Sequence, residues 1–178
     1  TLSEFMMTNK YEYTGEHFRI VNDLDFQNDS IQLLAVNGVK FDGVLDGSGK
    51  TVKNYVYANK NSTATRWEGP NRYRGVNIGL IGTVGANGIV KNLTANGKFE
   101  AVNSIGGIAG EVYGTLQDCV HDGTIANTSG SNCSGIAHKV YDGGQLINCV
   151  NNGSVTSKTT YASGIALSLI HISEPTRR

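Results

Sequence analysis

The feature that most constrains this sequence is a short phrase that returns four times between residues 78 and 166. The phrase is a glycine followed by two apolar residues, and its copies begin at Gly79, Gly107, Gly135 and Gly164. Successive copies are 28, 28 and 29 residues apart. A repeat of this length indicates a stack of similar units, because one such unit cannot bury its apolar face alone.

The composition of each repeat predicts short strands rather than helices. Apolar runs of a few residues, rich in Ile, Val, Thr and Leu, are separated by Gly, Asn, Asp and Ser, and no window has helical periodicity long enough for a helix. We therefore predict an all-β fold in which each repeat is one coil of a parallel β-helix (solenoid), with coils about 4.8 Å apart.

Equivalent residues of such coils stack in columns. An Asn or Asp recurs in each repeat, two positions after an apolar residue, and we expect these residues to form one structural column at a bend, where side-chain amides can bond to neighbouring coils. Its predicted members are Asn54, Asn92, Asp118 and Asn148.

The glycine phrases, above all Gly79 to Gly82, resemble the GLUG repeat of bacterial surface proteins. Residues 41–54 look like the lead-in of that family, and residues 21–25 are similar to the strand before it. The resemblance covers most of residues 12–166, although His138 stands where the third copy would have its closing glycine. It implies a right-handed parallel β-helix in a secreted or cell-surface bacterial protein, often an adhesin or the stalk of a larger enzyme such as the IgA-cleaving metallopeptidases.

Residues 1–166 are expected to form a single β-helix fragment of a longer chain, with the repeat core at residues 78–166. Ser3 can cap a short N-terminal helix over residues 3–9, whose apolar side chains would cover an end or flank of the solenoid. Residues 18–26 are predicted to form one strand with Phe18, Ile20, Leu24 and Phe26 mainly inward.

Residues 167–178 are interpreted as sequencing-adapter read-through rather than native protein. Residues 167–177 match the translation of one frame of a common transposase adapter, and the match interrupts the fourth repeat. Segments of non-biological origin are excluded from fold reasoning. The alternative is a genuine C-terminal strand.

Residues 58–75 are predicted to form a protruding loop with a binding role. This stretch adds extra chain between two predicted coils, and long loops on rigid scaffolds often carry binding sites. Aromatic and guanidinium groups here could stack on a sugar or hold a carboxylate of a host or matrix glycan or protein. The alternative is that the aromatic rings pack on the flank of the solenoid. The candidate binding residues are Arg66, Trp67, Arg72, Tyr73 and Arg74.

Charge and cysteine content limit the other functions. Lys and Arg together number 15, as do Asp and Glu, so nothing favours nucleic acid as a partner. No apolar run approaches the length of a membrane span. Cys119 and Cys149 occupy the same position of adjacent repeats and are interpreted as stacked free thiols, since in-register neighbours on parallel strands seldom offer the torsion of a disulfide. Cys133 stands alone near a turn.

No catalytic motif is complete. Two acid pairs, Asp23 with Asp25 and Asp42 with Asp46, could serve a polysaccharide-cleaving enzyme of the pectin-lyase type, but turn-forming acids explain them better. His121 and His138 are read as surface or turn residues, and we expect neither a metal site nor a cofactor. We therefore predict a noncatalytic structural or adhesive segment, monomeric within a longer chain. The alternatives are the pectin-lyase type and the stalk of a surface metallopeptidase.

Overall fold

The computed structural model of the chain describes residues 12–36, 38–59, 78–102, 104–129, 132–158 and 161–169. These residues form an all-β parallel solenoid of about four turns and contain no helix. The predicted helix over residues 3–9 lies outside the described residues. The prediction of a parallel β-helix is confirmed, while its handedness stays a prediction.

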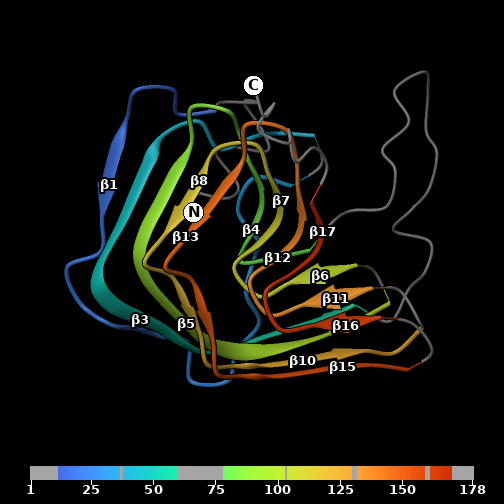
Figure 1. Cartoon of the computed structure of the whole chain (residues 1–178). Coiled ribbons are helices and arrows are strands. Elements are labelled where there is room, and N and C mark those ends of the chain that lie inside the picture. Colours follow the sequence, from blue (N-terminus) through green and yellow to red (C-terminus); the bar gives the residue numbers. More distant parts are fainter. Residues whose placement is uncertain are drawn as a thin grey trace, which may run out of the picture.

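The strands belong to three parallel sheets that run along the stack (Figure 1). The largest sheet contains β1 (His17–Arg19), β2 (Leu24–Asp25), β3 (Val44–Asn59), β5 (Ile89–Ala101), β8 (Thr115–Gln117), β9 (Val120–His121), β10 (Thr124–Asn127), β13 (Gln145–Ile147), β14 (Val150–Asn151) and β15 (Ser154–Ser157). The second contains β4 (Ile81–Val84), β7 (Ala109–Val112), β12 (Ala137–Val140) and β17 (Ala166–Leu169). The third contains β6 (Ile105–Gly106), β11 (Cys133–Ser134) and β16 (Ala162–Ser163).

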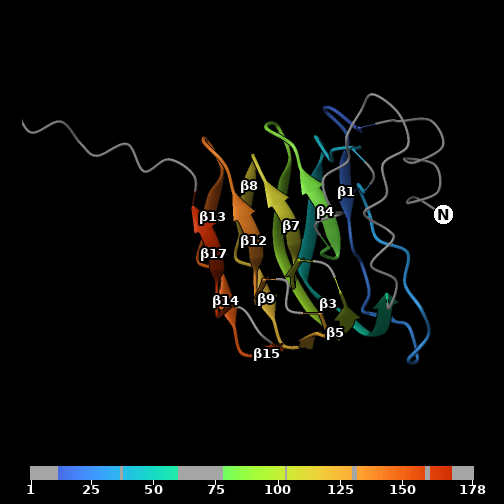
Figure 2. The same ribbon diagram turned by 90° about the vertical axis from the view of Figure 1, so that its right-hand side faces the viewer.

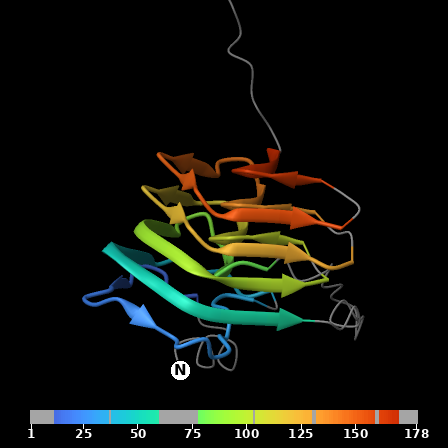
Figure 3. The same cartoon turned by 90° about the horizontal axis from the view of Figure 1, so that it is seen from below.

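Successive coils lie side by side in sequence order. Figure 2 shows the strands following one another from the blue end of the chain to the red end, and Figure 3 shows the same stack from below. The register is one repeat per coil: Ile81 pairs with Ala109, Ala109 with Ala137, and Ala137 with Ala166. Every repeat therefore occupies the same place in the cross-section.

Apolar side chains at equivalent positions fill the interior of the stack. The residue after each repeat glycine forms one core column, in which Ile108 and Ile136 are fully buried. Leu80 lies next to Ile108, and Ile165, next to Ile136, is 40% exposed. Burial thus declines in the last coil, which has a described coil on one side only. Columns of this kind replace the single core of a globular domain.

The repeat glycines are required by close contact between coils. A Cβ atom at Gly107 would lie 2.2 Å from the Gly135 carbonyl oxygen, and one at Gly135 would lie 2.2 Å from the Gly164 oxygen. At Gly164, in the last coil, a Cβ atom would meet nothing within 4 Å. Glycine is therefore needed wherever another coil follows.

The first coils depart from the predicted strands. Residues 18–26 do not form one strand, because β1 and β2 pair with separate parts of β3, and Leu24 is 44% exposed rather than inward. The cause is a register shift in β3 between Asp46 and Lys50, where a turn interrupts the pairing with β5. Ser48 adopts a positive φ of 52° in this turn.

The strand β17 extends over residues 167–169, and Ser168 and Leu169 pair with Lys139 and Val140 of β12. These are the first residues of the stretch interpreted as adapter read-through. The origin of residues 167–178 therefore stays a prediction.

Alanine substitutions at two repeat glycines should have different effects on stability. Gly107→Ala places a Cβ against backbone of the next coil and should lower the free energy of unfolding by about 2 kcal/mol or more. Gly164→Ala has open space and should be nearly neutral. Urea unfolding followed by circular dichroism measures both, and equal losses would contradict the proposed role of coil contact.

Candidate functional site

Paired Asp and Asn side chains join neighbouring coils along the largest sheet. In each pair an Asn side-chain amide donates to an Asp carboxylate of the preceding coil over 2.9–3.1 Å. We call these pairs the Asp–Asn rungs. They are Asp25–Asn54, Asp46–Asn92, Asp118–Asn148 and Asp122–Asn152.

The structure brings together three of the four residues of the predicted column. Lys91 pairs with Gln117 and Gln117 with Ile147, which places Asn92, Asp118 and Asn148 in register at the bend that follows these positions. All three have a positive φ, between 51° and 54°. Asn and Asp tolerate this conformation better than other side chains, which explains their recurrence at the bend.

The fourth member, Asn54, was placed in the wrong column. Asn54 and Tyr55 lie opposite Gly97, one bend further along the coil, and Asn92 instead bonds to Asp46. The error arises because β3 contains two register shifts, so that counting from the apolar residue before Asn54 gives the wrong bend. The rungs at Asp25 and Asp122 were not predicted from the sequence. Their Asn partners lie 29 and 30 residues later in the chain, which is close to the length of one repeat and could have indicated them.

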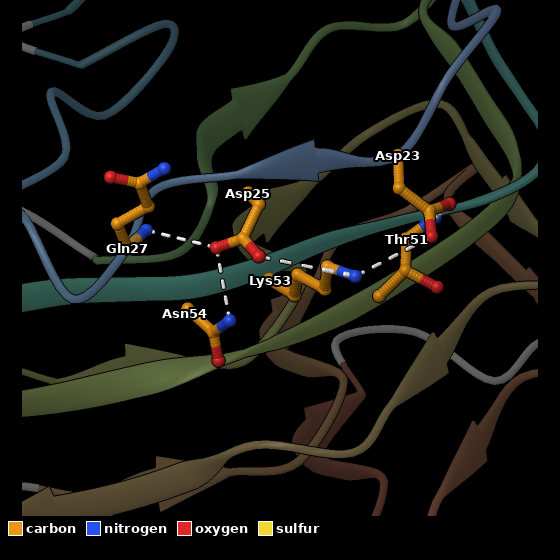
Figure 4. A network of polar contacts seen from close by, with 6 residues as sticks. All are labelled: Asp23, Asp25, Gln27, Thr51, Lys53 and Asn54. Atoms are coloured by element: carbon orange, nitrogen blue, oxygen red, sulfur yellow. Dashed lines mark hydrogen bonds and ion pairs between the residues drawn. The ribbon is translucent and has the colours of Figure 1, made fainter.

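A charged cluster surrounds the first rung (Figure 4). Lys53 Nζ lies 3.7 Å from Asp23 Oδ2 and 4.0 Å from Asp25 Oδ2. Asp23 accepts the Thr51 N–H, while Asp25 accepts both the Gln27 N–H and the Asn54 amide. The predicted pair Asp23 and Asp25 therefore does come together, and it joins the first coil to β3.

Hydrogen bonding lowers the pKa of two rung carboxylates, Asp25 and Asp46. The Gln27 N–H, followed by the Asn54 amide, lowers the pKa of Asp25. The Asn92 amide, followed by the Ser48 N–H, lowers the pKa of Asp46 in the same way. A general acid requires a raised carboxyl pKa at neutral pH, so neither group is tuned for that role. Asp42, the other member of the second acid pair, accepts the Asn87 N–H.

The two histidines read as surface residues are buried, which corrects that expectation. His121 is 0% exposed and His138 is 3% exposed. His121 faces the interior, where its Nδ1 lies 2.7 Å from Asn151 Oδ1 and its ring lies close to the position of Gly107. The missing side chain of that repeat glycine leaves room for the ring, a contact that sequence spacing does not reveal.

Burial suppresses the charge of both imidazoles. Loss of hydration lowers the pKa of His121, and it lowers the pKa of His138 to about 4. His121 Nε2 and His138 Nδ1 are buried without a hydrogen-bond partner, so neither site is prepared for an added proton. Within the described residues, no three His, Cys, Asp or Glu side chains gather to form a possible metal site.

Four connections of the chain begin and end at stacked positions on one corner of the solenoid, which we call the connection corner. Their first ends are stacked, since Asn59 pairs with Ala101, Ala101 with Asn127, and Asn127 with Ser157. Their second ends are stacked as well, at Ile78, Ile105, Cys133 and Ala162. The four connections are residues 60–77, 102–104, 128–132 and 158–161.

Side-chain hydrogen bonds to backbone atoms stabilise the described part of the connection corner. Asn127 is 4% exposed, and its Oδ1 accepts the Ser129 N–H over 3.1 Å. The Ser129 hydroxyl donates to the Val102 carbonyl of the preceding connection. Tyr161, in the last connection, is 76% exposed. The corner thus has an ordered base and presents polar and aromatic groups.

The candidate binding residues belong to the first connection and lie outside the described residues. Residues 60–77 link Asn59 to Ile78, so this segment begins and ends at the connection corner. It contains the candidate residues Arg66, Trp67, Arg72, Tyr73 and Arg74. Ala58 and Asn59, predicted as the start of the loop, instead complete β3.

Two curated proteins are similar to this chain at low identity. Halomucin of Haloquadratum walsbyi is 26% identical over 137 residues, which are 71% of this chain and 1% of halomucin. A putative Gly-rich membrane protein of Evansella cellulosilytica is 27% identical over 124 residues, which are 63% of this chain and 13% of that protein. The chain therefore spans a small part of either relative.

No protein-family model matches the chain, and no solved structure matches it significantly. The described residues include no helix with the length and apolar character required to cross a membrane.

Replacing Asn92 should separate the backbone and side-chain roles of a rung. Asn92→Leu loses the bond to Asp46 and forces Leu into a positive φ, so we expect a loss of about 2–3 kcal/mol in unfolding free energy. Asn92→Gly tolerates the backbone and should lose less. Asn96→Leu, on the same strand, is the control. Similar stabilities of the three variants in urea unfolding would contradict a role for the bend.

Acid should destabilise the protein through His138. An unfolded histidine binds a proton near pH 6.5, whereas His138 in the fold does so only near pH 4. Below pH 6.5 the unfolded state binds more protons, so stability should fall by about 3 kcal/mol as the pH drops to 4. His138→Gln should reduce this pH dependence, and His17→Gln, at an exposed position, should not. Parallel stability–pH curves for wild type and His138→Gln would count against this assignment.

Proposed function

We propose that this chain is a noncatalytic structural and adhesive segment of a bacterial secreted or cell-surface protein. It is built from GLUG-type repeats that wind as a right-handed β-helix, and it acts as a monomeric shaft within a longer chain. Contact with a host or matrix glycan or protein is made by the connections that leave the shaft.

The connection corner is the observation that carries the proposal. A continuous backbone ladder makes the stack stiff, and the residues that flank four connections are stacked in register on one side of it. Residues 60–77 are the longest of the four and contain the aromatic and guanidinium groups suited to stacking on sugars and pairing with carboxylates. Displaying such a segment from a rigid base reduces the freedom lost on binding.

The exposed surface near this corner is consistent with a shaft. In β15 the outward residues Ser154 and Thr156 alternate with partly buried ones, and they lie in register with Thr124 and Ala126 of β10. Small polar side chains of this kind keep a surface hydrated and do not form a catalytic site. The names of the two relatives, a halomucin and a putative membrane protein, support a location at the cell surface.

An enzyme of the pectin-lyase type is the second candidate, and the Asp23, Asp25 and Lys53 cluster favours it. Two acids and a base lie on one face across neighbouring coils, as cleavage of an acidic polysaccharide would require. However, both carboxylates already accept hydrogen bonds from backbone N–H groups, and Asp25 also accepts one from the Asn54 amide. Both also form ion pairs with Lys53. A third candidate, the stalk of a surface metallopeptidase, would use the same shaft.

Binding to glycan and matrix-protein arrays tests the adhesive role. The full chain should bind at least one class of glycan or matrix protein, and combined replacement of Arg66, Trp67, Arg72, Tyr73 and Arg74 by Ala should weaken that binding at least tenfold. Arg19→Ala, on β1, is the control and should bind normally. Undiminished binding by the combined variant would refute the assigned residues.

The enzyme alternative has its own readout. Polygalacturonate incubated with the chain would yield unsaturated products that absorb ultraviolet light. Their appearance, and their loss in Lys53→Ala and Asp25→Asn, would replace the adhesive proposal with the catalytic one.

A further inference from the structure

Two cysteines occupy equivalent places in neighbouring coils. Cys119 lies between β8 and β9, and Cys149 lies between β13 and β14. The following residues, Val120 and Val150, are paired in register, and the Val150 N–H donates to the Cys119 carbonyl over 2.9 Å. The two backbones are therefore fixed beside each other at these positions.

Both side chains belong to the interior of the stack. Cys119 is fully buried, and Cys149 is partly buried against the same apolar cluster. Cys149 Sγ lies 3.6 Å from the carbonyl oxygen of Leu116, a residue of the coil that carries Cys119. The Cys149 thiol thus points toward the coil of Cys119, while the Cys119 thiol lies 3.4 Å from the Gln117 carbonyl oxygen and 3.5 Å from that of Val90.

The backbone at the two cysteines differs from that of in-register neighbours within a regular strand. Asp118 and Asn148, directly before the two cysteines, have positive φ angles of 51° and 52°. Each cysteine therefore follows a bend and lies outside a regular strand. Neighbouring coils are about 4.8 Å apart, which is within the Cα–Cα range of disulfides, about 4.4–6.8 Å.

The two thiols are chemically unequal. Contact with Cys119 lowers the pKa of Cys149 to about 7, while the same contact and burial raise the pKa of Cys119. Near neutral pH a substantial fraction of Cys149 is a thiolate, the nucleophilic form. Cys149 is also the more exposed of the two.

We propose that Cys119 and Cys149 form an oxidation site at which a peroxide converts the stacked thiols into a disulfide between neighbouring coils. The Cys149 thiolate attacks one peroxide oxygen, the O–O bond breaks, and a sulfenic acid and one water result. The Cys119 sulfur then attacks the sulfenic sulfur, and the S–S bond forms as the second water leaves. Two thiols and one hydrogen peroxide give one disulfide and two waters, and two electrons pass to the peroxide.

The bond would act in a coil whose apolar side chains are partly exposed. The coil that carries Cys149 also carries Ile147 and Val150, which are 38% and 45% exposed. A covalent link closes the chain between residues 119 and 149 and restricts the unfolded state. Disulfides persist outside the cell, so the device suits the proposed location but does not depend on any ligand.

Peroxide treatment of the reduced full chain tests the proposal. Of the three free thiols, Cys119, Cys133 and Cys149, one should remain for alkylation, and the intact mass should fall by two hydrogens. Peptide mapping should find Cys119 linked to Cys149. The oxidation rate should rise about fivefold between pH 6 and pH 7, following the thiolate of Cys149. The melting temperature should rise by about 5 °C and return after reduction.

Matched cysteine variants complete the test. Cys133→Ala removes a buried cysteine of the third sheet and should form the same link at the same rate. Cys149→Ala and Cys119→Ala should keep two alkylatable thiols after treatment and show no thermal gain. The proposal fails if wild type keeps three alkylatable thiols, if the link involves Cys133, or if oxygen is added to the mass without loss of two hydrogens.

Discussion

The close approach of successive backbones is the constraint on which the rest of this structure depends. Each coil supplies hydrogen-bond partners for the next, so the residues that follow Gly107 and Gly135 must lie directly against another coil. That contact excludes a Cβ atom at the repeat glycines, fixes the repeat length and aligns the core columns. It also sets the Asp–Asn rungs and the cysteine pair in register, because each joins one coil to the next along the same ladder.

Periodicity in the sequence was sufficient to predict the solenoid because the constraint acts at every repeat. The glycine phrase fixed the coil step, and the residues Asn92, Asp118 and Asn148 marked the bend. The prediction failed where the period is broken. Extra residues in β3 move Asn54 to a different bend, and they divide residues 18–26 into two short strands. An insertion that preserves the fold but shifts the register cannot be located from spacing alone.

The interior polar groups were harder to predict than the fold. His121 and His138 were read from composition as surface residues, but the solenoid places both inside. The room for His121 comes from Gly107, a residue between β6 and β7 that contacts the His121 ring across the interior. Such a contact depends on which side chains face each other across the interior of one coil. The repeat pattern shows only which residues of successive coils stack on each other. The candidate site could be predicted only in part for a similar reason. The position of the connection corner follows from the strand register, whereas residues 60–77 are located only through the two residues that flank them, Asn59 and Ile78.

The Asp–Asn rungs have a direction: the carboxylate always belongs to the earlier coil and the amide to the later one. Repeated coils are similar enough that a folding chain could stack the wrong two together. If the coil carrying Asn92 were skipped, Asp46 would face Asp118, and two carboxylates would repel where a hydrogen bond should form. The rungs therefore distinguish otherwise interchangeable coils, and they make the order of the stack, as well as its stability, a property of the sequence.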